Sequence, residues 1–345
     1  MTDDGAAPHT GGGPSGPGTH RARTRRRAAR IGAALVALAA VIVGIWFAVS
    51  SGGGGTAPQP STPSASPAGN PLTGEGTAGR VLAVKIDNVG SAQRQQAGLN
   101  SADLVYVTRV EGGLSRYLAV FDSRHPPSRV GPVRSARQTD IPLLAPYGRV
   151  GFAYSGAISG LLPDLAAANL RNISPSADPR LFSNNGSSPT YIRPSEVFRA
   201  FPRLAPARDV GFRFGPAPAG GRPAATVSVR MPAASFVFTV SGTRWLVSVD
   251  GRSGRTADQV RLSTTNVIVQ HVQVVPGKYT DHNAGQPSNE VFSQTTGQGA
   301  ADFYRDGKVW HGQWSKPTDT SPTRYTVGGT PMNLSPGRTW IVLAG

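Results

Sequence analysis

The segment Arg109–Arg137, RVEGGLSRYLAVFDSRHPPSRVGPVRSAR, contains six arginines and only two acids. Guanidinium groups bind carboxylates and phosphates through two parallel hydrogen bonds. Arg134 and Arg137 stand three residues apart, so they are neighbours on a helix but lie on opposite faces of an extended segment. Two interpretations stay open: the arginines bind an anionic ligand, or one pairs with Glu111 or Asp140 while the other faces solvent.

Two carboxylates offer a second chemistry. Asp87 ends an apolar stretch and Glu111 precedes a Gly-Gly turn. A pair of carboxyl groups can serve as acid and as base or nucleophile in glycoside hydrolysis, so a cell-wall hydrolase using Asp87 and Glu111 is an alternative function. The chain has only four glutamates, each placed singly. Because catalytic roles are rare, an ion pair of Glu111 with Arg109, Arg116 or Arg134 is the favoured interpretation.

Other kinds of site have little support. The chain has no cysteine, and neither Ser135 nor Ser155 lies in a G-x-S-x-G motif. Its six histidines lack the spacing of metal ligands. The net charge of +16 comes with 31 arginines and four lysines but with no nucleic-acid-binding motif. We therefore expect no metal, no cofactor and no nucleic-acid partner, and the sequence does not favour an enzyme.

The N-terminus predicts a membrane protein. Residues 1–30 form a disordered basic tail with six arginines between Arg21 and Arg30, and residues 31–49 are apolar and uncharged. Nineteen such residues span about 30 Å of hydrocarbon, and the arginines before them place the tail in the cytoplasm. The segment 31–49 is thus expected to be a transmembrane signal anchor, with a cleaved signal peptide as the alternative. The remaining domains lie outside the cytoplasm.

The exported part divides into a stalk and two domains. Residues 50–79 are rich in Gly, Ser and Pro and predict a flexible linker. Residues 80–214 predict an α+β domain with a strand at 81–87, a hairpin of 104–110 with 114–121, and short helices, one of them capped by Ser195. Residues 222–345 alternate between short apolar runs and turns, which predicts a mainly β domain, a small antiparallel barrel or sandwich.

Several motifs make the chain similar to a known family. KIDN, ADLVYV, VEGGLSR, GPVRSAR and, later, DGKVWHGQWSKP occur between residues 79 and 345. They resemble the YerB-like family of bacterial envelope proteins, which are built from a domain of unknown function with N- and C-terminal parts. Val107 and Ser115 depart from the family pattern. Many relatives are lipoproteins, and the absence of cysteine here implies an anchor helix instead.

We therefore expect a membrane-anchored, extracytoplasmic binding or accessory protein of the cell envelope. Its partners would be the membrane, through residues 31–49, and an anionic cell-wall ligand or a wall-assembly protein. A protein-binding adaptor is a further alternative. The expected ligand-binding residues are Asp87, Asn88, Arg109, Glu111, Arg116, Arg134, Ser135 and Arg137.

Overall fold

The computed structural model describes residues 69–183, 189–281 and 288–345. The predicted tail 1–30, the predicted anchor 31–49 and most of the predicted linker lie outside these ranges. Within them, no helix combines the length and apolar character needed to cross a membrane. All of the described residues belong to one compact unit, which runs from Ala65 to Gly345.

The end of the predicted linker, residues 69–79, is packed against the domain. Leu72 is fully buried in an apolar cluster, and the backbone N–H of Gly79 donates to the carboxylate of Asp122 at 2.6 Å. The prediction of a flexible linker up to residue 79 was therefore wrong for its last eleven residues, because one large apolar side chain and its polar neighbours have partners in the core.

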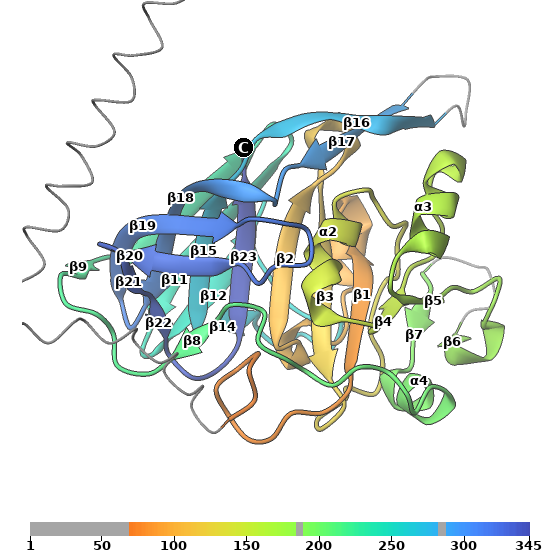
Figure 1. The fold of residues 1–345 in the computed structure, drawn as a ribbon, viewed down its shortest axis with the longest axis horizontal. Helices are drawn as coiled ribbons and strands as arrows, with labels where there is room; N and C mark the ends of the chain where they lie inside the picture. Colours follow the sequence, from red (N-terminus) through yellow and green to blue (C-terminus); the bar gives the residue numbers. More distant parts are fainter. Residues whose placement is uncertain (1–68, 184–188, 282–287) are drawn as a thin grey trace, which may run out of the picture. The chain divides into compact units, whose positions relative to one another are not determined.

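A 12-stranded sheet forms the centre of the unit (Figure 1). The order across it is β21-β20-β19-β18-β15-β23-β2-β3-β1-β4-β5, with β9 beside β19. Its strands are β1 (Val81–Asp87), β2 (Leu104–Arg109), β3 (Ser115–Asp122), β4 (Gly151–Ala153), β5 (Arg171–Ile173), β9 (Arg222–Pro223), β15 (Asn266–His271), β18 (Gly297–Arg305), β19 (Lys308–Lys316), β20 (Arg324–Val327), β21 (Thr330–Pro331) and β23 (Thr339–Ala344). The predicted strand 81–87 and the predicted hairpin are both confirmed, since β2 and β3 pair antiparallel.

A second, 5-stranded sheet packs on one face of this large sheet. It contains β10 (Thr226–Met231), β11 (Ala234–Ser241), β12 (Arg244–Val249), β13 (Arg252–Ser253) and β14 (Ser263–Thr264). Its apolar side chains, Phe236 and Phe238 among them, share one cluster with Val105 and Val107 of β2. Side chains alternate along a strand, so Val105 and Val107 point to the same face of the large sheet. We call the face that the second sheet covers the small-sheet face.

The opposite face of the large sheet is covered by helices and loops, and we call it the helix face. Leu104 and Tyr106 of β2 pack there with α2 (Asp140–Leu144). The other helices are α3 (Leu162–Ala167), whose Leu165 belongs to the same cluster, and α4 (Pro194–Ala200), whose Val197 and Phe198 belong instead to the cluster of the small-sheet face. Short pairs are β6 (Phe182–Ser183) with β7 (Tyr191–Ile192), β8 (Arg213–Phe214) with β22 (Asn333–Leu334), and the longer hairpin β16 (Val274–Asp281) with β17 (Ser288–Ser293). The residue that caps α4 is Arg193 and not Ser195, because the helix begins at Pro194.

The predicted β-rich second half is present, but it does not form a barrel or sandwich of its own. Strands β15, β18 to β21 and β23 extend the sheet begun by β1 to β5, and β23 lies parallel between β15 and β2. The residues from 222 onward therefore share one sheet and one apolar cluster with the predicted α+β domain. The described chain is mostly β, with few and short helices.

Candidate functional site

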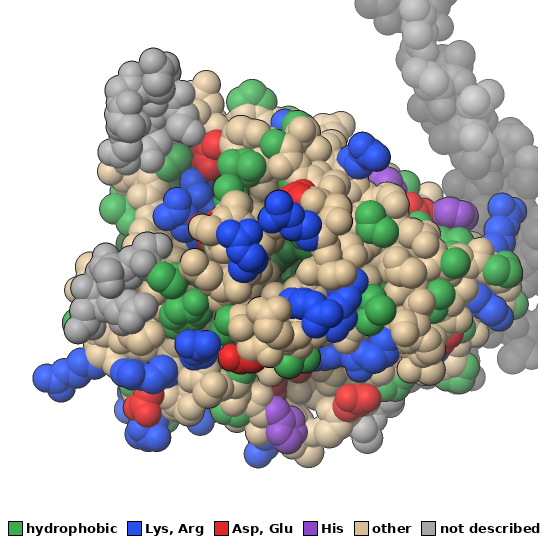
Figure 2. Space-filling view, turned by 180° about the vertical axis from the view of Figure 1, so that it is seen from behind, with side chains coloured by type: hydrophobic (Ala, Val, Ile, Leu, Met, Phe, Trp, Pro, Cys, Tyr) green, Lys and Arg blue, Asp and Glu red, His purple; other side chains and the backbone are tan. Residues whose placement is uncertain are grey.

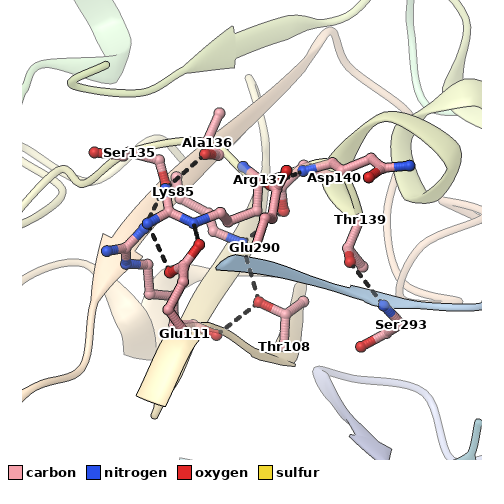
Figure 3. Close-up of polar contacts among 12 residues, drawn as sticks. Lys85, Thr108, Glu111, Ser135, Ala136, Arg137, Thr139, Asp140, Glu290 and Ser293 are labelled. Carbon is pink, nitrogen blue, oxygen red and sulfur yellow. Dashed lines mark hydrogen bonds and ion pairs between the residues drawn. The ribbon is translucent and has the colours of Figure 1, made fainter. Parts of the chain in front are cut away.

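Five of the eight predicted site residues gather on the helix face, at one end of β1 to β3. Asp87 and Thr108 both lie opposite Arg116 in the strand registers, so the three side chains share one face. An extended segment brings Arg134 beside β1, where its N–H donates to the carbonyl of Lys85. The same segment carries Arg137 to the hairpin turn that contains Glu111 (Figure 3).

Two predicted residues belong to the other face. Arg109 and Asn88 alternate with Thr108 and Asp87 along their strands, and the Asn88 amide donates to the Ser115 hydroxyl at 2.8 Å. The prediction that Arg109 and Asn88 join the cluster was wrong, because neighbouring residues of a strand point in opposite directions. Figure 2 shows the side of the molecule that is turned away in Figure 1, where the small sheet lies and where further Lys and Arg side chains gather.

Glu111 is held by a forked pair with Arg137. The Nε and Nη2 atoms of Arg137 donate to the two carboxylate oxygens at 2.5 and 2.8 Å, and Nη1 donates to the carbonyl of Ala136 at 2.8 Å. Burial opposes ionisation of Glu111, but the hydrogen bonds and charge of Arg137 outweigh it and keep the pKa below its ordinary value. Each of the three nitrogens of Arg137 therefore has an acceptor within the protein.

Arg116 lacks such compensation. Its side chain is buried, one Nη1 donor reaches the carbonyl of Ser135 at 3.1 Å, and its Nε has no acceptor among the described residues. Burial, followed by the charge of Arg137, lowers the pKa of Arg116 to about 10. Ser135 thus contributes its backbone carbonyl and not its hydroxyl. A guanidinium that is buried beside another one is a place where an anion would be stabilised.

Arg134 provides the accessible edge of the cluster. Its side chain is 52% exposed, and its Nε lies 3.3 Å from the carboxylate of Asp87. The predicted ion pair of Glu111 is present, but its partner is Arg137 and not Arg109, Arg116 or Arg134. The arginine that faces solvent is Arg134. Both carboxylates of the hydrolase hypothesis, Asp87 and Glu111, are in ion pairs with arginines.

A buried ion pair that was not predicted from the sequence lies beneath these arginines. Lys85 and Asp140 have no exposed side-chain surface and approach to 2.6 Å, while Lys85 also donates to the Thr108 hydroxyl at 3.0 Å. Burial lowers the pKa of Lys85, against the charge of Asp140. Asp140 in turn accepts from the backbone N–H of Arg137 at 2.7 Å, so the pair fixes the chain where Arg137 begins. A lysine within the apolar run VLAVKID was the available signal.

Glu290 is a second residue of this region that was not predicted from the sequence. It lies on β17, where one carboxyl oxygen accepts from the backbone N–H of Gln138 at 2.6 Å and the other is buried without a partner among the described residues. Burial raises the pKa of Glu290 to about 7. The hairpin β16–β17 is further held at α2 by the N–H of Ser293, which donates to the Thr139 hydroxyl.

The charges of the site do not balance. Arg116, Arg134 and Arg137 face Glu111 and Asp87, while Lys85 and Asp140 neutralise each other, which leaves a surplus of one positive charge when Glu290 is protonated. Across the described ranges, no group of three or more His, Asp or Glu side chains is arranged to hold a metal ion. The chemistry that this arrangement supports is the binding of a carboxylate or a phosphate.

Comparison with known proteins gives a family and a fold. Residues 68–206 match the model described as "Protein of unknown function (DUF3048) N-terminal domain", and residues 225–341 match that of its C-terminal domain. A stretch of 73 residues is 45% identical to the putative lipoprotein YerB of Bacillus subtilis (strain 168); it covers 20% of this chain and only 22% of that protein. The crystal structure of the Bacillus subtilis YerB protein superposes with a TM-score of 0.66 at 20% identity, over 80% of this chain and 96% of that one, which is a likeness of fold.

Proposed function

This chain belongs to the family of the DUF3048 domains, and we propose that it is a membrane-anchored envelope protein that binds an anionic ligand through Arg116 and Arg134. The relative's name, a putative lipoprotein, supports a place at the envelope. A lipid-modified cysteine cannot supply the anchor in a sequence without cysteine. The anchor is instead the uncharged segment 31–49 behind its six arginines, which leaves the folded unit outside the cytoplasm.

One observation carries the proposed ligand class: the uncompensated charge of Arg116. The nearest carboxylates are taken, Glu111 by Arg137 and Asp87 by Arg134, and the Nε of Arg116 has no acceptor within the described part of the chain. An anion next to Arg116 and Arg134 would supply the missing negative charge. Carboxylates and phosphates of the cell wall, such as those of stem peptides and phosphate polymers, have the matching chemistry.

The test is a calorimetric titration of the full chain, held in nanodiscs of neutral phosphatidylcholine. The probes are a muramoyl pentapeptide and a glycerol phosphate oligomer, which separate a carboxylate from a phosphate ligand. We expect one of them to bind and Arg134→Gln to weaken that binding roughly tenfold, the usual worth of one charge-assisted hydrogen bond. Arg199→Gln is the matched control, since Arg199 is an exposed arginine in an ion pair with Glu196.

Arg116→Gln should remove binding. Its melting temperature must be measured alongside, because Arg116 is buried. Failure of both probes to bind, or equal affinity for the wild type and the Arg134→Gln variant, would contradict the proposed function.

A further inference from the structure

A pocket at the β5 edge of the large sheet is separate from the site described above. It has a volume of about 380 Å³ and is lined by Arg149, Arg171, Ala200, Phe201, Pro202, Arg203 and Leu204. Small-molecule sites range from roughly 300 to 1,000 Å³, so the pocket has the size of such a site. It lies at β4, β5 and the end of α4, whereas the arginine cluster lies at one end of β1 to β3.

One wall of the pocket is apolar. Phe201 and Leu204 follow the end of α4, with Ala200 and Pro202 beside them. Leu204 is buried in the apolar cluster of the small-sheet face, and Phe201 packs partly against it. A hydrocarbon chain placed here would leave water and contact an existing apolar surface, which is favourable.

The other wall carries three arginines and little negative charge. The guanidinium of Arg171 lies 4.2 Å from the ring centroid of Phe201 and donates to Asp178 at 3.0 Å, while its Nε is buried without an acceptor in the described ranges. Arg149 and Arg203 are exposed, and neither side chain has a hydrogen bond or ion pair with any residue that the structure describes. Three positive charges thus face one carboxylate.

The backbone holds both walls in place. The N–H of Ala205 donates to the carbonyl of Arg149 at 3.0 Å, and the N–H of Arg171 donates to the carbonyl of Val150 at 2.8 Å. Phe201 is tied to α4 by its own N–H, which donates to the carbonyl of Val197 at 2.9 Å. The apolar wall and the backbones of Arg149 and Arg171 are therefore positioned before any ligand arrives, which reduces the entropy lost on binding.

We propose that this pocket binds an anionic amphiphile: a phosphate ester whose head lies between Arg149, Arg171 and Arg203 and whose hydrocarbon chain lies on Phe201 and Leu204. A phosphate monoester carries close to two negative charges at neutral pH, which matches the surplus of two positive charges left after Asp178 pairs with Arg171. Such an ester could come from a membrane lipid headgroup or from a free alkyl phosphate. The inference does not rest on the proposed function, because it involves none of the same residues.

The test separates head, tail and source. The full chain in neutral phosphatidylcholine nanodiscs is titrated with hexyl phosphate, inorganic phosphate and hexanol. Hexyl phosphate should bind at least tenfold more tightly than inorganic phosphate, and hexanol should not bind. The double variant Arg149→Gln/Arg203→Gln should lose at least tenfold in affinity for hexyl phosphate. Arg222→Gln/Arg230→Gln removes the same charge at exposed positions outside the pocket and should leave binding unchanged.

The source is identified by repeating the titration in nanodiscs that contain phosphatidic acid. Competition with hexyl phosphate assigns the pocket to a lipid headgroup, and unchanged affinity assigns it to a free ester; both results support the pocket. The proposal is overturned if hexyl phosphate binds no more tightly than inorganic phosphate, or if the Arg149/Arg203 variant binds it like the wild type.

Discussion

Glu290 lies near Arg137, and its carboxyl group changes protonation in an accessible pH range. It is fully buried, and burial raises its pKa to about 7, against about 4.3 for an unfolded chain. Between these two values the folded protein holds a proton that the unfolded chain has lost. The stability that Glu290 contributes is therefore present in acid and decreases as the pH rises from about 4.5 to about 7.

Replacement of Glu290 by Gln should remove this contribution. Gln keeps an acceptor for the N–H of Gln138 but cannot ionise, so Glu290→Gln should be more stable than the wild type at pH 8, by about 1–3 kcal/mol, and equal to it near pH 4. Part of the pH dependence should remain, because burial also raises the pKa of Asp103 to about 7. Thermal denaturation followed by circular dichroism across pH 4–8 measures both, with Glu196→Gln at a half-exposed position as control. An unchanged pH dependence in Glu290→Gln would contradict the assignment.

The chemistry of single residues was predictable from the sequence only in part. The concentration of arginines around Glu111 is visible in the printed sequence, and it forms a real cluster with Arg137 and Arg116. Which arginine takes which carboxylate depends on where an extended segment runs beside β1, and no spacing rule contains that. Lys85 and Glu290 were not predicted because each lies against a segment far away in the chain. Lys85 pairs with Asp140 of α2, and Glu290 of β17 accepts from the backbone N–H of Gln138.

At the scale of elements, the hairpin β2–β3 was predictable because its signals are local. Two strand-forming runs flank Gly112-Gly113, and both glycines have positive φ, 66° and 72°. The turn is also where the two sheets meet, since the N–H of Ala233 donates to the carbonyl of Gly113 at 2.9 Å. This contact joins residues more than a hundred positions apart, and the local pattern does not encode it.

The two glycines of the turn should therefore respond differently to the same substitution. At Gly112 a new Cβ meets nothing closer than 3.8 Å, so Gly112→Ala should cost only the left-handed backbone strain, about 1–2 kcal/mol. At Gly113 the Cβ would lie 2.6 Å from the Cβ of Pro232, so Gly113→Ala must also displace the small sheet. We expect the loss for Gly113→Ala to be at least twice that for Gly112→Ala in urea denaturation. Equal losses of stability would mean that Pro232 moves away from the new Cβ at no cost in free energy.

At the scale of the whole described unit, the two family segments are not two separate folds. The matches cover residues 68–206 and 225–341, and the predicted boundary at 215–221 lies in the interval between them. Yet β23 pairs with β2 along Leu104–Val107. Trp340 of β23 also packs edge-on against Tyr117 of β3, with 5.2 Å between the ring centroids. The composition of the sequence predicts a connection at 215–221, but it does not reveal that the strands beyond it return to the first sheet.

The two segments should therefore fold only together. Without residues 222–345, β2 loses the parallel partner β23 and exposes Val105 and Val107, which the small sheet covers. Without residues 65–214, the small sheet and β15 lose the same cluster. We expect the fragments 65–214 and 222–345 each to give poorly dispersed amide spectra alone, and a co-expressed pair to give the dispersed spectrum of intact 65–345. Two well-dispersed spectra from the separate fragments would show that each segment has a sufficient core of its own, and that the shared sheet forms after both have folded.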